Sequence, residues 1–331
     1  MDRMSEEIIE ATQALDAELK IVREFQLNTE DQNQLVFFFK PEVFFEKKEA
    51  NVREVLSLAS GLFETFGVSV SGCAVLPGTK LAEMGSMDRH YGFINALSRG
   101  ASWKLDEKQK AAALEDLGLT EAEFLGGHEV LLRYESFDPS SLEKFWATKK
   151  SKKLRSGMYV QSYKVDGRTL VIVNGFHPAQ LEHFTGEDRR LVLMLVSSDL
   201  PWHVLRTYML GNTFPERAVP GSFRRVLYDR ARDLGFADVS IANNCAHISA
   251  GPFEALAEMR NFLRPILGDH WVVADTRICQ LAQEAGLSMT ALDQLAGDVT
   301  LAMNGEVLSL YDLTEHCDCR SALSLFSAYS E

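Results

Sequence analysis

Hydrophobic residues follow two different patterns in the first part of the chain. Residues Leu35–Phe39 are apolar without interruption, which predicts a short buried strand. Apolar side chains then recur every three or four positions from Val52 to Phe66, which predicts an amphipathic helix that ends at Gly67. Residues 68–75 alternate between polar and apolar, as a half-buried strand does. We therefore expect a β-α-β unit here, preceded by an acidic helix in residues 1–33.

The same patterns return in the second half of the chain. Leu191–Val196 predicts another buried strand, and helical stretches follow at Trp202–Leu210 and Ser222–Leu234. Asp238–Ala242 is predicted to be a further core strand, and Pro252–Leu263 is predicted to be a helix. Without the middle of the chain, this order approximates β-α-β-β-α-β, so the predicted fold class is α+β with a ferredoxin-like core.

Residues 97–175 have a character of their own and are predicted to form an inserted α/β subdomain. They are charged and helical up to Leu119, strand-like at Val130–Tyr134 and helical again near Leu142–Thr148. A hairpin is predicted at 159–164 and 168–173, around Asp166-Gly167. The predicted domains are therefore a helical extension (1–33), a core (34–96 and 176–265), the insertion (97–175) and a C-terminal extension (266–331).

Charge limits the classes of function that suit the chain. The 331 residues carry a formal net charge of -13, whereas nucleic-acid and membrane-surface proteins usually need a broad positive surface. A basic run at Lys149–Lys153, with Arg155, could attract phosphates, but such a run is more typical of a solvated face. Any phosphate ligand must be held by a local basic cluster, and we expect neither nucleic acid nor membrane as a partner.

The sequence shows no recognisable membrane span or secretory signal, and its cysteine pattern suits a reducing compartment. Apolar runs stay well short of the roughly 20 residues of a membrane span, and Met1–Gln34 is too charged for a secretory signal. The five cysteines are scattered, which suits reduced thiols better than a disulfide framework. His316-Cys-Asp-Cys319 lacks a second ligand pair at zinc-like spacing, so a plain turn is favoured over a metal site. We expect a cytoplasmic protein.

Two neighbouring motifs supply the parts of a phosphoryl-transfer site. Asn244 and His247 offer an amide and an imidazole at the end of an apolar stretch. Thr213 and Arg224, in the segment that begins Met209-Leu-Gly211, offer a hydroxyl and a guanidinium. Phosphoryl transfer requires mainly positioning and charge neutralisation from a protein, which these residue types provide.

These motifs resemble those of the nucleoside diphosphate kinase family. That family places its nucleophilic histidine in an Asn-x-x-His-Gly-Ser-Asp-Ser loop, after a Met-Leu-Gly-x-Thr-x-Pro…Pro-Gly-Thr/Ser-Ile-Arg segment. The matching positions are Met209-Leu-Gly211, Thr213, Pro215, Pro220-Gly-Ser222, Arg224, Asn244 and His247. The resemblance covers residues 34–96 and 176–265, and it implies the ferredoxin-like core of that family.

The resemblance also implies roles for individual residues. His247 is the nucleophile, Glu258 holds its ring, and Ser249 is a hydrogen-bond partner nearby. The phosphate contacts implied are those of Lys40, Arg206, Thr213, Arg224 and Asn244. Tyr91, Phe176 and Ile241 are implied to form the nucleotide site, with Phe176 stacked on the base and Ile241 on its other side.

The implied activity is transfer of the γ-phosphate of a nucleoside triphosphate to a nucleoside diphosphate. Covalent catalysis through phospho-His247 would split the transfer into two steps of a ping-pong mechanism. Mg²⁺ is the expected cofactor, held mainly by the nucleotide, so no protein metal site is needed. The resemblance also implies a homo-oligomer, with Ala218–Gly221 similar to a loop used in such assemblies.

The sequence departs from the family pattern at the nucleophile. The family's Gly-Ser-Asp-Ser is replaced by Ile248-Ser249-Ala250-Gly251, and Thr207 stands where an arginine is expected, with Arg206 one residue earlier. Two hypotheses stay open at this stage. The chain is either an active kinase, or a catalytically weakened nucleotide-binding protein that acts in regulation or as a scaffold.

Overall fold

The chain folds into two compact units. The structure is a computed structural model that describes residues 2–14, 18–27, 30–155, 157–165, 167–268, 273–288, 290–291, 297, 300–303 and 306–329. Unit 1 comprises Met1–Lys80 and Glu187–Glu331, and unit 2 comprises Leu81–Gly186. Unit 2 contains the whole predicted insertion and continues beyond it at both ends. Helices and strands are mixed in both units.

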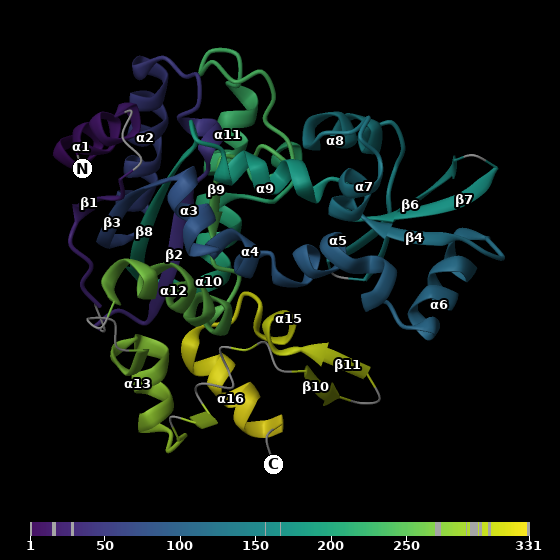
Figure 1. Cartoon of the computed structure of the whole chain (residues 1–331). Helices are drawn as coiled ribbons and strands as arrows, with labels where there is room; N and C mark the ends of the chain where they lie inside the picture. The colour runs from purple at the N-terminus through teal and green to yellow at the C-terminus, as the bar shows by residue number, and fades with distance from the viewer. Residues whose placement is uncertain are drawn as a thin grey trace. The chain divides into compact units, whose positions relative to one another are not determined.

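Unit 1 is built on a five-stranded sheet with the order β1-β3-β8-β2-β9. Its strands are β1 (Lys20–Arg23), β2 (Asn33–Phe39), β3 (Ser69–Pro77), β8 (Arg190–Ser198) and β9 (Ala246–Ile248). All neighbouring pairs are antiparallel. The apolar runs that predicted strands at 35–39 and 191–196 form β2 and β8, which are buried along their whole length in the middle of the sheet (Figure 1).

Side chains of β2 alternate between two helical layers. Phe37 packs against Phe63 of α2 (Glu49–Thr65), with ring centroids 5.2 Å apart. Phe38 points to the other face, where its ring lies 5.9 Å from Phe262 of α12 (Pro252–Leu267). Because successive side chains of a strand point to opposite faces, both faces of this strand are apolar and both are covered. This explains why the sequence shows an unbroken apolar run rather than an alternating one.

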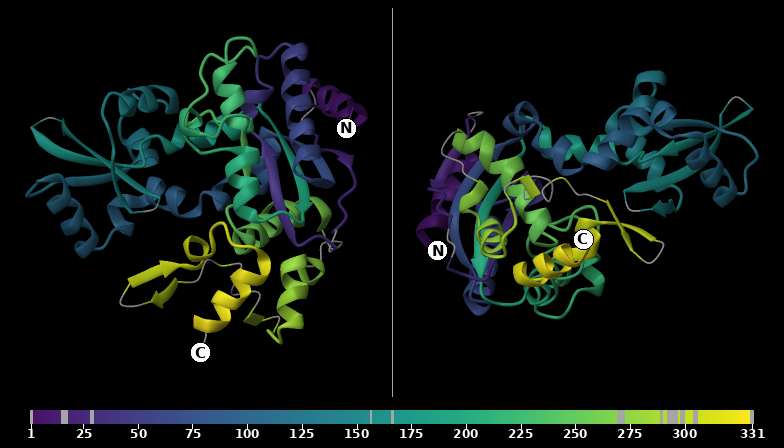
Figure 2. Two further views of the ribbon diagram at one scale, coloured as in Figure 1. Left: turned by 180° about the vertical axis from the view of Figure 1, so that it is seen from behind. Right: turned by 90° about the horizontal axis from the view of Figure 1, so that it is seen from below.

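The remaining helices and the hairpin of unit 1 complete its two layers and its C-terminal part. They are α1 (Asp2–Gln13), α10 (Trp202–Val204), a π-helix (Leu205–Leu210), α11 (Phe223–Asp229), α13 (Arg277–Glu284), β10 (Thr300–Met303), β11 (Glu306–Ser309), α15 (Leu310–Thr314) and α16 (Cys319–Tyr329). Short 3-10 turns lie at Pro41–Val43, Pro215–Arg217 and Val273–Asp275. Helices α13 and α16 lie side by side (Figure 2), and His316-Cys-Asp-Cys319 is a turn that leads into α16.

Unit 2 is built on a four-stranded sheet with the order β4-β7-β6-β5. Its elements are α4 (Ser86–His90), α5 (Gly92–Lys104), α6 (Glu107–Leu117), β4 (Glu123–Gly126), α7 (Gly127–Arg133), α8 (Pro139–Ala147), β5 (Lys152–Arg155), β6 (Met158–Val165), β7 (Arg168–Val173) and α9 (His177–Thr185). Helix α3 (Gly78–Met84) contains the boundary between the units. The predicted hairpin is confirmed as β6 and β7, and Asp166 lies outside the described residues.

The two faces of this second sheet carry separate apolar cores. Val171 and Val173 belong to one cluster together with Leu97 of α5. Leu170 and Ile172 belong to the other cluster. The alternation along β7 therefore divides the interior of unit 2 into two layers.

Three predicted elements are wrong. Residues 238–242 form no strand, and bends lie at residues 240–242. Residues two apart in a strand lie on the same face, but Val239 is buried and Ile241 is 51% exposed. Residues 130–134 belong largely to helix α7, which begins where the Glu129 carboxylate accepts a 2.7 Å hydrogen bond from the Gly126 amide. The helix predicted for residues 1–33 ends at Gln13, and β1 follows it at the edge of the sheet.

Among the described residues, no helix is both long enough and apolar enough to cross a membrane.

Candidate functional site

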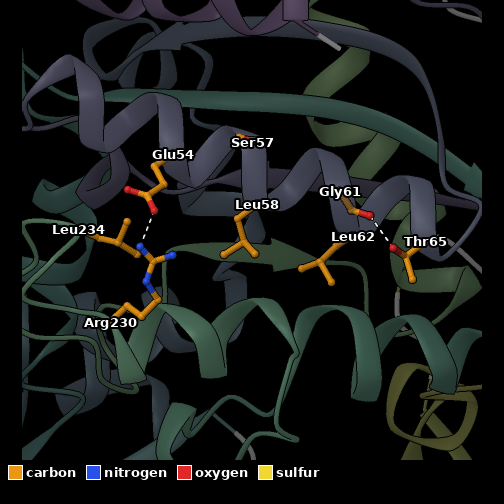
Figure 3. A pocket seen from close by; sticks show the side chains of 8 residues that line it. All are labelled: Glu54, Ser57, Leu58, Gly61, Leu62, Thr65, Arg230 and Leu234. Atoms are coloured by element: carbon orange, nitrogen blue, oxygen red, sulfur yellow. Dashed lines mark hydrogen bonds and ion pairs between the residues drawn. The ribbon is translucent and has the colours of Figure 1, made fainter.

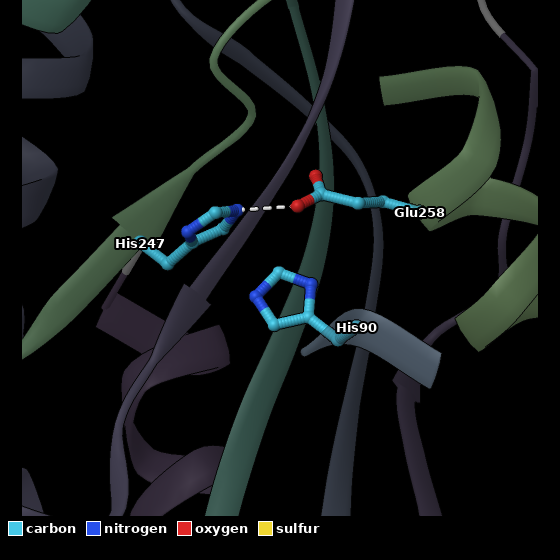
Figure 4. Close-up of side chains that lie close together, drawn as sticks. All are labelled: His90, His247 and Glu258. Carbon is cyan, nitrogen blue, oxygen red and sulfur yellow. Dashed lines mark hydrogen bonds and ion pairs between the residues drawn. The ribbon is translucent and has the colours of Figure 1, made fainter. Parts of the chain in front are cut away.

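The strand register positions His247 of β9 against helix α12. His247 lies opposite Phe38 in the β2–β9 pair, on the face of the sheet that α12 covers. Its imidazole stacks on the Phe38 ring at a centroid distance of 4.5 Å, with an angle of 17° between the planes. The ring nitrogen Nε2 is 2.7 Å from Oε1 of Glu258 (Figure 4). The predicted nucleophile and its predicted carboxylate partner are thus hydrogen-bonded to each other.

The Glu258 carboxylate is itself fixed by a second donor. Its side chain is 4% exposed, and Oε2 accepts a 2.5 Å hydrogen bond from Oγ of Ser249. The Ser249 hydroxyl oxygen also accepts a 3.0 Å hydrogen bond from the Val36 amide of β2. A carboxylate held in this way acts as an acceptor, so we assign the imidazole proton to Nε2 and the lone pair to Nδ1. This is the tautomer that a nucleophilic imidazole needs.

Positive charges around His247 keep its ring neutral. Burial lowers the pKa of His247 well below its ordinary value, and the cations Arg206, Lys40 and Arg224 act in the same direction. Desolvation and like charge both disfavour an imidazolium. The ring is therefore neutral at neutral pH, in surroundings that carry positive charge.

Lys40 follows β2 directly and is joined to the segment that precedes His247. Its amide donates a 2.9 Å hydrogen bond to the Cys245 carbonyl. Glu42, two residues farther on, accepts a 2.8 Å hydrogen bond from the Cys245 amide. Burial lowers the pKa of the Lys40 ammonium, and the Glu42 carboxylate partly offsets this effect. The end of β2 and the segment before β9 are thus tied together beside the half-buried Lys40 cation.

Arg224 is buried, with an exposed fraction of 7%, and its guanidinium contacts three protein acceptors. It donates to the carbonyls of Gly211 (3.0 Å) and Ala246 (2.8 Å) and to Oδ1 of Asn244 (3.4 Å). Its Nε has no hydrogen-bond partner within the part of the chain that the structure describes. Burial, reinforced by Arg206, lowers the pKa of Arg224 to about 9. Arg224 therefore connects three segments of the site and retains one buried donor group.

The glycine of Met209-Leu-Gly211 is required by the backbone. Gly211 has φ of 96°, in the region that favours glycine, and a Cβ there would lie 2.5 Å from Oγ of Ser222. This conformation presents the Gly211 carbonyl to Arg224. The backbone conformation and the packing at Gly211 thus explain the glycine of this motif independently of the family resemblance.

Asn244 joins the two loops that carry Thr213 and Ile241. Its Nδ2 donates to the carbonyls of Ile241 (3.2 Å) and Thr213 (3.5 Å), and the residue is 2% exposed. Thr213 and Ile241 are themselves exposed. Their backbones belong to the site, while the ligand contacts expected of their side chains stay predictions.

Arg206 joins the His247 strand to the C-terminal part of unit 1. It lies on the π-helix, and its guanidinium donates a 3.0 Å hydrogen bond to the Ile248 carbonyl. It also forms a 3.2 Å ion pair with Glu315, in the turn after α15. A phosphate contact from Arg206 stays a prediction.

Tyr91 and Phe176 both belong to unit 2 and pack inside it. The Tyr91 ring lies 5.8 Å from the ring of His177. The Phe176 ring lies 6.0 Å from Trp146 and 5.8 Å from Tyr159. Both aromatic side chains thus have a packing role within their unit. Their expected contacts with a nucleotide stay predictions.

Sequence reasoning missed three acidic residues and one aromatic residue of the site: Phe38, Glu42, Glu254 and Glu315. Glu254 lies one helical turn before Glu258, a spacing that could have indicated a carboxylate pair. It accepts a 2.6 Å hydrogen bond from the Ala250 amide, and burial together with Glu258 raises its pKa to about 8. Phe38 could have been found from the alternation along β2, but Glu315 is far away in the sequence and carries no local signal.

A shallow groove lies elsewhere in unit 1 and contains none of the predicted site residues. It has a volume of about 420 Å³ and runs between α2 and residues 230–234 (Figure 3). Leu58, Leu62 and Leu234 line it, and an ion pair between Glu54 and Arg230 lies at one end. Its lining includes no histidine, so the imidazole of the phosphoryl-transfer motif lies at the His247 site instead.

Comparison with known proteins adds little to the geometry. No protein-family model matches the chain, and no curated protein matches it either. Among solved structures, the chain is similar to an NDP kinase from Pyrobaculum aerophilum, at 17% identity and a TM-score of 0.33, over 69% of this chain and 94% of that chain. A likeness at this score carries no argument, so functional conclusions rest on the site itself.

Proposed function

We propose that the chain is a nucleoside diphosphate kinase-like phosphotransferase with His247 as its nucleophile. One observation carries the proposal. The imidazole Nε2 of His247 lies 2.7 Å from the buried Glu258 carboxylate, and the nearby cations Arg206, Lys40 and Arg224 supply positive charge. Such an arrangement suits an incoming phosphate and a nitrogen nucleophile at once.

The order of strands supports a ferredoxin-like core for this proposal. Taken in chain order, β2, β3, β8 and β9 are the first to fourth strands of a βαββαβ unit, with α2 between the first and second strands and α10, the π-helix and α11 between the third and fourth. In the sheet these four strands lie in the order β3-β8-β2-β9, which is second, third, first and fourth in chain order. All neighbours are antiparallel, as a ferredoxin-like sheet requires.

In the first half-reaction, Nδ1 of His247 attacks the γ-phosphorus of a nucleoside triphosphate. A P–N bond forms, the bond from phosphorus to the β,γ-bridging oxygen breaks, and the nucleoside diphosphate leaves with that electron pair. Glu258 keeps the Nε2 proton in place and stabilises the positive charge that develops on the ring. Ser249 holds the carboxylate during this step.

In the second half-reaction, a terminal phosphate oxygen of an acceptor nucleoside diphosphate attacks the phosphorus. The P–N bond breaks and its electron pair returns to Nδ1, so the enzyme is regenerated. Lys40 and the remaining donor of Arg224 neutralise the phosphate oxygens in both steps. Tyr91, Phe176 and Ile241 are proposed to contact the base.

Mg²⁺ is proposed to arrive with the nucleotide. Glu254 and Glu258 already accept hydrogen bonds from protein donors, and Glu42 does so from the Cys245 amide. These carboxylates are engaged in holding the site, which fits a cation carried by the phosphates instead. The ion would neutralise phosphate charge when bound.

A second candidate function has its own supporting observation. Arg224 and Arg206 both direct their guanidinium groups to protein acceptors. This favours a nucleotide-binding regulatory protein in which catalysis is weakened. Binding without turnover is the property that separates it from the kinase.

The test is incubation of the protein with γ-labelled ATP. The kinase proposal predicts acid-labile, base-stable label on the protein, no label on His247→Gln, and discharge of the label by added GDP. Absence of label on the wild-type chain would rule out the kinase. If nucleotide still binds with micromolar affinity in that case, the regulatory candidate gains support.

A further inference from the structure

The loop that follows His247 is enclosed by the C-terminal part of unit 1. Residues 248–251 comprise the last residue of β9 and the connection to α12, and a turn at residues 314–316 lies against them. The His316 amide donates a 2.9 Å hydrogen bond to the Ala250 carbonyl. Arg206 bridges the two segments, since its guanidinium contacts both the Ile248 carbonyl and the Glu315 carboxylate.

Gly251 marks the point of closest approach between the loop and the turn. A Cβ at this position would lie 2.6 Å from the Thr314 carbonyl oxygen, a backbone atom that cannot move aside alone. Its φ of -160° is ordinary extended backbone, so conformation does not require glycine here. Space requires it, because the turn occupies the position that a side chain would take.

Each residue of the loop is held from a defined direction. The Ser249 amide donates to the Val36 carbonyl of β2 at 3.0 Å. The Ala250 amide donates to Oε2 of Glu254 at 2.6 Å, while its carbonyl faces the turn. Sheet, helix α12 and C-terminal turn thus fix three sides of a short segment.

We propose that the turn at residues 314–316 is a positioning element of the His247 site, with Arg206 and Glu315 as its positioning residues. It holds the loop that carries Ser249, and Ser249 in turn holds the carboxylate that orients His247. Arg206 thereby acts through the loop rather than by contact with the phosphate. The catalytic consequence of this inference rests on the proposed function. The contacts by which the turn at residues 314–316 holds residues 248–251, called the clamp below, do not depend on that function.

The backbone contacts contribute more to this clamp than the ion pair does. The Glu315 side chain is 44% exposed, and an ion pair at such a site is weakened by solvent. The hydrogen bond from His316 to Ala250 and the packing at Gly251 lie between backbones. We therefore expect a steric change at Gly251 to have a larger effect than a charge change at Glu315.

The decisive variant is Gly251→Ala, which changes no charge and no hydrogen-bonding group. Gly61→Ala is the matched control, because a Cβ at Gly61 meets nothing within 4 Å. In Gly251→Ala, we expect amide exchange in a peptide covering residues 246–251 to become about 10-fold faster. Single-turnover formation of phosphohistidine should fall about 10-fold or more, as displacement of a catalytic group does, while the dissociation constant for ATP stays unchanged. Gly61→Ala should match the wild type in all three measurements.

A milder variant covers the case in which Gly251→Ala fails to fold. Glu315→Gln removes one side of the ion pair and should speed exchange of the same peptide about 3-fold, as expected for a partly exposed pair. Glu284→Gln removes another ion pair of the C-terminal part, with Arg320, and serves as its control.

The outcomes test the proposed clamp and the proposed kinase function separately. Unchanged exchange at residues 246–251 in both Gly251→Ala and Glu315→Gln would overturn the clamp. Faster exchange with an unchanged rate of phosphorylation would overturn its role in positioning. If the wild-type chain takes up no label, the proposed function fails, and the exchange measurement still decides whether the turn holds the loop.

Discussion

Each unit of the molecule contains a hydrogen-bonded cluster around a histidine whose pKa is lowered by burial, and the two clusters are built differently. In unit 1, His247 bonds to an acidic side chain, and Arg206, Lys40 and Arg224 surround it. In unit 2, the histidines bond to neutral side chains. Burial lowers the pKa of the histidine in both places, so a lowered pKa alone does not identify a reactive residue.

The unit 2 cluster satisfies polar groups inside the fold. Nδ1 of His128 lies 2.8 Å from Oγ of Ser98, and Ser98 is completely buried. His177 lies between Oδ1 of Asn95 (3.2 Å) and Oε1 of Gln180 (2.9 Å). A serine and a histidine in contact can form a nucleophilic pair, but this serine has no exposed surface through which a substrate could reach it. The cluster therefore serves packing and hydrogen bonding.

The difference indicates which features of the His247 site support its proposed reactivity. A hydrogen-bonded carboxylate, a second donor to that carboxylate and a set of neighbouring cations occur together only around His247, among the histidines in the described residues. Changes that remove these features should affect phosphorylation. Matched changes in unit 2 should affect stability alone.

The largest effect is expected for Glu258→Gln. Loss of the carboxylate removes the acceptor that stabilises positive charge on the ring, so the rate of phosphohistidine formation should fall about 10²–10³-fold. Asp88→Asn is the matched change in unit 2, where Asp88 accepts a hydrogen bond from Asn95. Rapid-quench labelling with γ-labelled ATP measures both. An equal loss of rate in the two variants would remove the distinction between the clusters.

Asn174→Ala should cost about 3 kcal/mol of unfolding free energy without reducing phosphorylation. Asn174 is buried at a φ of 50°, and its amide contacts the Tyr159 amide and the carbonyls of Ile94 and Gly157. Alanine leaves these groups without partners and is strained at positive φ. Urea unfolding gives the stability. Asn244→Ala in unit 1 is the comparison, and it should lower phosphorylation as well as stability.

Acidification should destabilise the protein through its buried histidines. Burial lowers the pKa of His128 from 6.5 to about 4 in the folded state. The unfolded chain therefore binds more protons below pH 6.5, and stability is lost as the pH falls from about 6.5 towards 4. Because His128 is partly exposed and solvent screens part of the effect, this residue should contribute a loss of about 1 kcal/mol or less between pH 7 and pH 5. His128→Gln should flatten the profile of urea midpoint against pH, and an unchanged slope would contradict the assignment.

The smallest effect is expected in the basic run. Lys150 and Lys153 are exposed, so changing both to glutamine should alter unfolding free energy by less than about 0.5 kcal/mol. Phosphorylation and ATP affinity should also stay the same. A marked loss of ATP affinity would show that this run attracts phosphates, the alternative that the sequence left open.

Sequence patterns predicted the buried strands inside the sheet better than the short strand β9 at its edge. The runs at 35–39 and 191–196 are confirmed as strands because both faces of β2 and β8 are covered. The strand predicted at 238–242 failed because β9, a strand of three residues, lies just after it. So short a segment shows no recognisable alternation. The sheet register with β2, rather than local propensity, decides which residues pair.

The candidate site was predictable where its residues lie close together in the sequence. His247, Asn244 and Arg224 lie within one stretch of chain whose spacing could be recognised, and the structure brings them together. Glu42 and Glu315 reach the same region from opposite ends of the chain. Their contacts depend on the end of β2 and on the turn after α15, which no local pattern indicates. Single-sequence reasoning therefore predicted His247 together with Glu258 and Ser249, and it missed the more distant Glu42 and Glu315.

The most direct test is the position of phosphate on the protein after reaction with ATP. The hydrogen bond from Nε2 to Glu258 assigns the lone pair to Nδ1, so ³¹P NMR and peptide mapping should identify Nδ1-phosphohistidine at His247. Addition of GDP should remove this signal and yield GTP. Phosphate on another residue, or on no residue at all, would contradict His247 as the nucleophile, and phosphate on Nε2 of His247 would contradict the assignment of the lone pair to Nδ1.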